Sequence, residues 1–121
     1  MIQTTQQKAI AAFSTLTALR KKVKGKDALS LFRLKTALQI NLDFQTEEEM
    51  KLVSEYGGRV TDDGKVIIED AEKRTAYQKA FAELGKLECE VSCDPVSISV
   101  DKNPDITLGE IEALDGFVKF E

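Results

Sequence analysis

The 121-residue sequence contains no histidine and no tryptophan, and only two cysteines and two prolines. Histidine is the side chain that most often acts as a general base in enzymes and as a metal ligand in proteins. A catalytic or metal-binding site would therefore have to use carboxylates, hydroxyls or thiols alone. We accordingly expect a protein that is not an enzyme and that needs no metal and no cofactor.

Motifs that cradle phosphates or activate a nucleophile are also missing. The chain has no phosphate-binding loop, no dinucleotide-binding glycine motif and no serine-nucleophile elbow. Acid pairs such as Asp62 with Asp63 occur beside turns, where carboxylates usually serve solubility, and spacing alone does not bring them into one cleft.

Cys89 and Cys93 are the only cysteines. Four residues apart on one face of a strand, they would lie about 13 Å from each other, which is beyond disulfide reach. On a helix they would be about 6 Å apart, but two thiols without a histidine make a poor metal site. We expect two buried free thiols.

Long apolar runs are absent near the N-terminus, where the longest, Ala9 to Phe13, has only five residues. No basic segment precedes it, so the pattern predicts neither a signal peptide nor a membrane span. We expect a cytoplasmic protein with no membrane partner. At this length, with 42% hydrophobic and 31% charged residues, a single domain over residues 1–121 is expected.

Charge is distributed unevenly along the chain. Residues 1–40 hold eight Lys or Arg and one acid, Asp27, for a net charge of +7, whereas residues 41–121 hold nine basic and twenty acidic residues, for −11. Such asymmetry favours internal charge pairing, head-to-tail assembly, or an acidic partner for the basic third.

Residues 27–56 carry the longest run without Gly or Pro. Thr46 and Glu49 have the form of a capping box, which would start a new helix there. Because no Gly or Pro precedes them, we instead predict one helix about 45 Å long, ended by Gly57 and Gly58.

The apolar positions of this predicted helix form two stripes. One consists of Ala28, Leu31, Leu38 and Leu42, and the opposite one of Leu29, Phe32, Ile40 and Phe44. Since one partner helix cannot cover both, the second stripe predicts a homo-oligomer interface.

The rest of the chain predicts short alternating elements. The first helix is expected at 4–24, begun by Thr4 or Thr5 and ended by Gly25, with Asp27 as the N-cap of the long helix. We expect a hairpin with arms 59–61 and 65–68, a helix after Asp70, strands at 87–93 and 96–100 that pair antiparallel or lie side by side, and a short helix and terminal strand after Thr107.

These elements predict an α+β fold. It consists of an N-terminal antiparallel helical hairpin with a long second helix over residues 1–56, followed over residues 57–121 by a β-hairpin, a third helix and a small, mostly antiparallel β-sheet with a short C-terminal helix.

Residues 101–112 resemble a calcium-binding loop in spacing. Its positions one, three, five and twelve are Asp101, Asn103, Asp105 and Glu112. Position six, which needs Gly for a sharp turn, is Ile106, and Pro104 stiffens the segment. We therefore expect a turn and a capped helix rather than a calcium site.

A basic cluster lies where the first helix meets the second, and two further cations follow in the long helix. Its members are Arg20, Lys21, Lys22, Lys24, Lys26, Arg33 and Lys35. Cations suit a helix C-terminus, so a solvated helix end is one interpretation. The other is an anion-binding or partner-binding surface, for a protein, a phosphorylated small molecule or, with no aromatic residue inside the cluster, less readily a nucleic acid.

The order of a Leu-rich helix, KLVSEYGG, a Gly-containing hairpin, AFAELGKLECEV and TLGEIEALDGFVKF resembles small accessory proteins of bacteriophages and prophages. The resemblance covers about residues 28–120 and brings no catalytic residues. It implies a virus-encoded protein that acts by binding in the bacterial host's cytoplasm. Expected functions are inhibition of a host defence system, including an anti-CRISPR role, sequestration of a nucleotide signal, or phage assembly.

Overall fold

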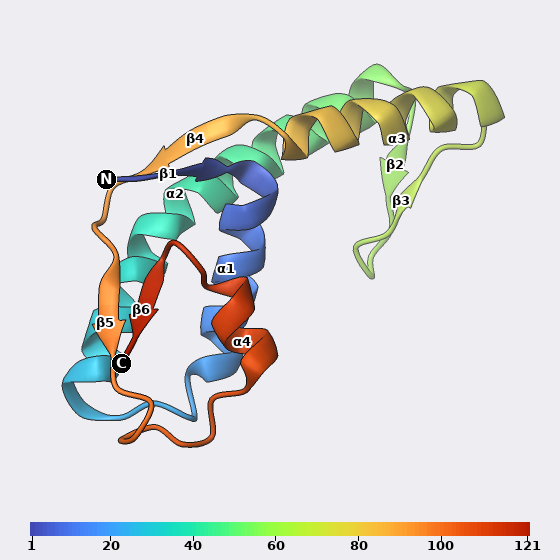
Figure 1. Cartoon of the computed structure of the whole chain (residues 1–121). Helices are drawn as coiled ribbons and strands as arrows, with labels where there is room; N and C mark the ends of the chain where they lie inside the picture. The colour runs from blue at the N-terminus through green and yellow to red at the C-terminus, as the bar shows by residue number, and fades with distance from the viewer.

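The computed structural model describes all residues 1–121 and has the expected α+β architecture, with a long second helix (Figure 1). None of its helices combines the length and apolarity needed to cross a membrane. The elements in chain order are β1 (Ile2–Thr5), α1 (Gln6–Leu19), α2 (Gly25–Glu55), β2 (Arg59–Val60), β3 (Val66–Ile67), α3 (Ala71–Gly85), β4 (Glu88–Val91), β5 (Val96–Ile98), α4 (Leu108–Ala113) and β6 (Val118–Phe120).

Helix α2 is continuous over 31 residues, as predicted. The hydroxyl of Thr46 donates to the carbonyl of Leu42 at 3.0 Å within the helix, so Thr46 does not begin a new one. The predicted stop is also confirmed. Gly57 has φ 67°, and the N–H groups of Gly57 and Gly58 donate to the carbonyls of Ser54 and Val53 at 3.2 and 2.8 Å. This is the Schellman arrangement, which satisfies the last carbonyls of a helix.

The first helix is shorter than predicted. It covers Gln6–Leu19 rather than 4–24, because residues 2–5 form strand β1, which pairs antiparallel with β4. Gly25, expected to end α1, instead begins α2 with φ 65°, and residues 20–24 connect the two helices. The sequence gives no local signal for β1, since a strand of four residues is defined by the partner it pairs with.

The predicted pairing of the strands after α3 is wrong. Strand β4 pairs with β1, and β5 pairs in parallel with β6, so two of the three strand pairs are antiparallel and one is parallel. Asp94 and Pro95 separate β4 from β5, which therefore belong to different pairs. The β2–β3 hairpin, by contrast, is antiparallel as predicted, because its turn is set locally by residues such as Gly64, at φ 84°.

Both predicted helix caps in the second half are present. The carboxylate of Asp70 accepts from the backbone N–H of Lys73 at 2.9 Å, which caps α3. Thr107 and Glu110 form a complete capping box at the start of α4. Each cap satisfies N–H groups that a helix start leaves without partners.

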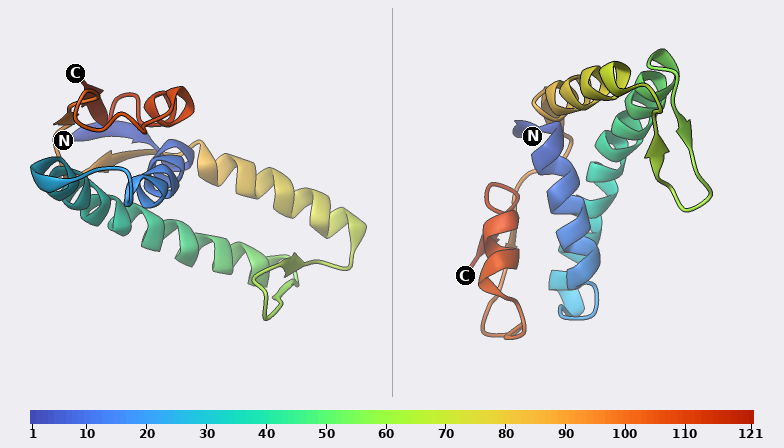
Figure 2. Two further views of the ribbon diagram at one scale, coloured as in Figure 1. Left: turned by 90° about the horizontal axis from the view of Figure 1, so that it is seen from below. Right: turned by 90° about the vertical axis from the view of Figure 1, so that its right-hand side faces the viewer.

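The apolar interior has two parts, both touching α2. The larger cluster has 15 buried residues from most elements, with Leu34 and Leu38 of α2 fully enclosed. The smaller consists of Val53, Ile68 and Tyr77, where α2 meets β3 and α3. Figure 2 shows α2 and α3 extending beyond the N-terminal end of α1, with the β2–β3 hairpin at their far end. The helix therefore connects two packed regions.

Asp27 is not the N-cap of α2, which begins two residues earlier. Its carboxylate instead accepts from the side-chain amide of Asn103 at 2.9 Å and from the N–H of Ser99 at 3.3 Å. Asn103 is only 2% exposed and also donates to the carbonyl of Ser99 at 2.8 Å and accepts from the N–H of Lys24 at 3.3 Å. Asn103, the third position of the segment 101–112 that resembles a calcium-binding loop in spacing, thus points inward. No group of three or more His, Cys, Asp or Glu side chains in the structure could hold a metal ion.

We predict that Asn103→Ala lowers the free energy of unfolding by about 1–3 kcal/mol, because the Asp27 carboxylate and the backbone groups around it lose a buried partner. Urea denaturation followed by circular dichroism measures the change. Lys102→Ala, at the exposed neighbouring position, is the matched control and should change stability by less than about 0.5 kcal/mol. Equal effects of the two substitutions would contradict a structural role for the Asn103 amide.

Candidate functional site

The basic residues singled out from the sequence do not form one cluster in the structure. Lys22 is paired with Glu110 of α4. Arg20 and Lys35 lie together at an apolar pocket. The remaining four are exposed and make no salt bridge: Lys21, Lys24, Lys26 and Arg33.

The Lys22 ammonium donates to the Glu110 carboxylate at 2.9 Å, and the Glu110 side chain is only 13% exposed. Burial disfavours the charged carboxylate and on its own raises its pKa. The N–H of Thr107, the Lys22 ammonium and the Thr107 hydroxyl outweigh that effect, so the pKa of Glu110 lies below its ordinary value. Lys22 is therefore not part of a freely solvated helix end, which was one interpretation of the basic cluster, because this lysine joins the α1–α2 connection to α4.

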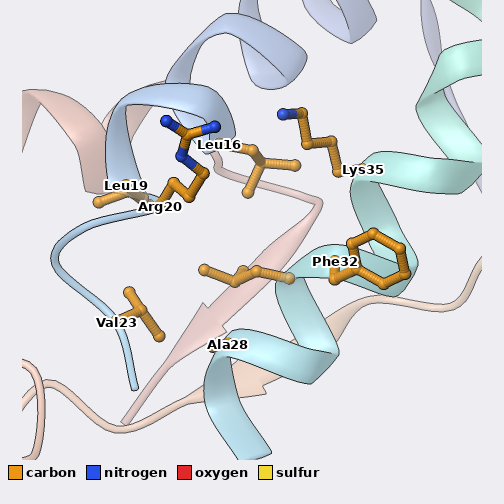
Figure 3. Close-up of a pocket in the computed structure, with 8 residues that line it drawn as sticks. Leu16, Leu19, Arg20, Val23, Ala28, Phe32 and Lys35 are labelled. Carbon is orange, nitrogen blue, oxygen red and sulfur yellow. The ribbon is translucent and has the colours of Figure 1, made fainter. Parts of the chain in front are cut away.

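A pocket lies between the end of α1 and the start of α2 and encloses about 120 Å³. We call it the α1–α2 pocket. Its lining residues are Leu16, Leu19, Arg20, Val23, Ala28, Leu31, Phe32 and Lys35. Figure 3 shows the Arg20 guanidinium and the Lys35 ammonium on the same side of the pocket, with the Phe32 ring at its edge. The pocket therefore offers an apolar floor and a rim that is positive on one side.

The two rim cations have no acidic partner within the chain. The Lys35 nitrogen lies 5.1 Å from the centroid of the Phe13 ring, a cation–π contact that orients it. The single acid of the basic third, Asp27, is used by Asn103 and Ser99. Arg20 and Lys35 are thus free to meet an anionic group from outside.

The sequence did not predict this pocket. In the sequence, Arg20 and Lys35 lie in different predicted helices, separated by the connection between them. Phe32 was assigned only to the second apolar stripe, which was predicted to be an oligomer interface. It also placed no aromatic residue with the basic cluster, whereas the fold brings Phe32 to the same pocket as Arg20 and Lys35. The spacing of Phe32 and Lys35 along one helix was the available signal, but only the packing of α1 against α2 places Arg20 beside them.

The second apolar stripe of α2 is exposed, as expected for a face that the chain itself does not cover. The exposed fractions are 50% for Leu29, 64% for Phe32, 67% for Ile40 and 43% for Phe44. The first stripe points inward, with Leu31 and Leu38 in the main core.

Both cysteines are free and half-buried, and burial raises the pKa of each thiol. The negative charge of Asp94 raises that of Cys93 further. A raised pKa leaves little thiolate near neutral pH, and thiolate is the form that attacks electrophiles and binds metals. The two thiols therefore offer little reactivity.

Comparison of the chain with protein-family models, with curated proteins and with solved structures finds no match.

We predict that Glu110 makes stability depend on pH in an identifiable window. Because its pKa is lowered on folding, the unfolded state binds more protons between the lowered value and the ordinary 4.5. The stabilisation is therefore complete above pH 4.5 and is lost as the pH falls through the folded-state pKa. Glu110→Gln should destabilise the protein by about 1 kcal/mol near pH 7, and the difference from wild type should shrink as the pH falls below 4.5.

Chemical denaturation at a series of pH values measures this difference. Glu112→Gln, at the exposed position two residues further along α4, removes the same charge without the Lys22 pair and should behave like wild type throughout. A difference between Glu110→Gln and wild type that stays constant from neutral to acidic pH would show that the protonation of Glu110 is not linked to folding.

Proposed function

We propose that this chain is a non-enzymatic interaction protein that binds an acidic segment of a partner protein, with one apolar side chain of the partner inserted in the α1–α2 pocket. The observation that supports the proposal is the apolar pocket whose rim carries Arg20 and Lys35 without an acidic partner. An apolar anchor gives such a complex its buried contact, and carboxylates beside the anchor meet the two cations.

The size of the pocket favours a side chain over a small molecule. Sites for cofactors and drug-sized ligands usually enclose about 300–1,000 Å³, and this pocket encloses about 120 Å³. A leucine or phenylalanine side chain fits such a space, whereas a nucleotide base with its sugar does not. Anchors of this kind dominate the energy of many protein interfaces.

The charge around the pocket favours an acidic partner. Lys21 and Lys24 lie in the exposed connection that follows Arg20, and neither has a carboxylate partner. Clustered positive charge accelerates encounter with an acidic surface and makes binding weaken with salt, since exposed charges are screened within about 10 Å at 0.1 M. Added salt should therefore weaken the electrostatic contribution to the affinity, whereas it should not weaken the contribution of the apolar anchor.

The resemblance to phage accessory proteins makes a host protein the partner class to test first. Inhibition of a host defence complex, including an anti-CRISPR role, is part of this proposal. The alternatives are a nucleotide signal, a nucleic acid and a phage assembly partner, and the experiment below separates the first two from a protein segment.

The test is fluorescence polarisation with labelled probes. The probes are a peptide of aspartates and glutamates with one central phenylalanine, the same peptide with alanine at the centre, a serine-rich peptide with the central phenylalanine, a cyclic nucleotide and a single-stranded oligonucleotide. We predict that the acidic peptide with phenylalanine binds at least about tenfold more tightly than either other peptide, because each of these lacks the anchor or the charge.

Two charge-reversed variants provide the matched comparison. Arg20→Glu/Lys35→Glu should raise the dissociation constant of the acidic peptide at least about tenfold. Lys21→Glu/Lys24→Glu makes the same change in net charge and should weaken binding less, only through the long-range electrostatic field of the protein. Equal losses would show that the pocket rim has no specific role. Preferred binding of the nucleotide or the oligonucleotide, or no binding of any peptide, would overturn the proposal.

A further inference from the structure

The exposed side of α2 holds a line of seven positions along most of the helix, three of them apolar and four polar or charged. Its positions, spaced alternately by four and three, are Leu29, Arg33, Thr36, Ile40, Asp43, Glu47 and Met50, and all of them are exposed. We call this set the exposed seam. Phe32 and Phe44 flank it on its two sides. A spacing that averages 3.5 residues keeps a set of side chains facing a second helix at a shallow crossing angle.

The seam lies opposite the face that the chain itself covers. Leu34 and Leu38, which point the other way, are buried in the main core, and Gln45 on the same side is also buried. Figure 2 shows α1 and α3 on one side of α2 and no helix on the other, where only the β2–β3 hairpin projects beside the C-terminal end. Large apolar side chains such as Ile40, which is 67% exposed, gain from being covered.

The two ends of the seam carry opposite charges. Arg33 lies toward its start, and Asp43 and Glu47 lie toward its end. None of the three makes a salt bridge within the chain, and Asp43 accepts only a neutral hydrogen bond from Gln39, at 2.9 Å. Arg33 and Asp43 are about 15 Å apart along one helix. Their charges therefore cannot pair within one copy.

We propose that the exposed seam binds the same seam of a second copy, with the two α2 helices antiparallel. A parallel pair would place Arg33 beside Arg33 and Glu47 beside Glu47, which repels. An antiparallel pair places the basic start of each seam beside the acidic end of the other. Charge complementarity within the seam thus selects a second copy of this chain as the occupant.

The same charges select the register. When the two-fold axis passes near the level of residue 38, midway between Arg33 and Asp43, each Arg33 lies level with Asp43 of the second copy, and Ile40 lies level with Thr36. A shift of the axis toward the start of α2 brings the two Arg33 side chains together. Each dimer therefore contains the Arg33–Asp43 contact twice, and Lys26 lies near the acidic end of the second copy.

This surface borders the α1–α2 pocket, because Phe32 lines the pocket and also flanks the seam, but the charged residues of the two surfaces differ. Arg33 and Lys35 are two residues apart, so they point about 160° away from each other around the helix. Lys35 faces the pocket, with its ammonium over Phe13, and Arg33 belongs to the seam. The dimer therefore goes beyond the proposed function, and each can be disrupted without the other.

The seam extends about 32 Å from Leu29 to Met50. Two helices that meet along this length bury an area at the low end for protein interfaces, below about 1,200 Å² in total. We expect association in the micromolar range, so sedimentation equilibrium of the full chain should cover about 1–500 µM. The expected result is a reversible monomer–dimer equilibrium that weakens with added salt.

Charge reversal and restoration test the antiparallel register. Arg33→Glu and Asp43→Arg should each weaken the dimer about tenfold, because each turns two attractive contacts into repulsive ones. The double variant Arg33→Glu/Asp43→Arg should restore the dissociation constant to within about threefold of wild type. A double variant that is as weak as the single ones would overturn the antiparallel arrangement.

Ile40→Asp should leave the chain monomeric at every concentration. Leu108→Asp, an equally exposed apolar position on α4 with an exposed fraction of 71%, should leave the dimer intact, as should Lys35→Glu. A wild-type chain that is monomeric at about 500 µM, or an Ile40→Asp variant that still dimerises, would overturn the proposal. Binding of the acidic peptide by Ile40→Asp is measured in parallel, so that failure of the dimer and failure of the proposed function are distinguished.

Discussion

The continuity of α2 is the constraint on which the rest of the structure depends. Its first half supplies Leu34 and Leu38 to the main core, and its last turns supply Val53 to the small cluster with Ile68 and Tyr77. Three buried residues could not hold a hairpin and a 15-residue helix together by themselves. The second region is stable because α2 reaches it from the main core without a kink or a break.

The middle of α2 lies between the two apolar clusters and is polar. Asn41 and Gln45 are buried there with Gln6 of α1. The Gln6 amide donates to the carbonyl of Asn41 at 3.3 Å, and the Asn41 amide donates to the carbonyl of Glu90 in β4 at 3.5 Å. The side-chain oxygen of Gln45, by contrast, is buried without a partner. Because polar groups are costly to bury unpaired, the bonds of Gln6 and Asn41 favour one alignment of α1, α2 and β4 over alternatives shifted along the helix.

Both proposed surfaces follow from the number of apolar positions on α2. The helix carries more of them than one partner helix can hide, since α1 packs with the side that holds Leu34 and Leu38, whereas Leu29 and Ile40 stay exposed. The flank with Phe32 and Lys35 forms the α1–α2 pocket together with α1, and the neighbouring exposed face carries the seam. The chain thus presents two adjoining surfaces, because its longest helix has more apolar positions than the rest of the chain covers.

The sequence by itself determined the features that depend on residues close together in the chain. The length of α2, the stop at Gly57, the β2–β3 hairpin and the caps at Asp70 and Thr107 each rest on hydrogen bonds or periodicity within a few residues, so local patterns predict them. Only the tertiary structure decided the strand partners of β4 and β5, the bond from Asp27 to Asn103, the pairing of Lys22 with Glu110, and the meeting of Arg20, Phe32 and Lys35 at one pocket. These contacts join segments that are distant in the chain or brought together by helix packing, and no local pattern of polar and apolar residues specifies which distant segment will become the neighbour.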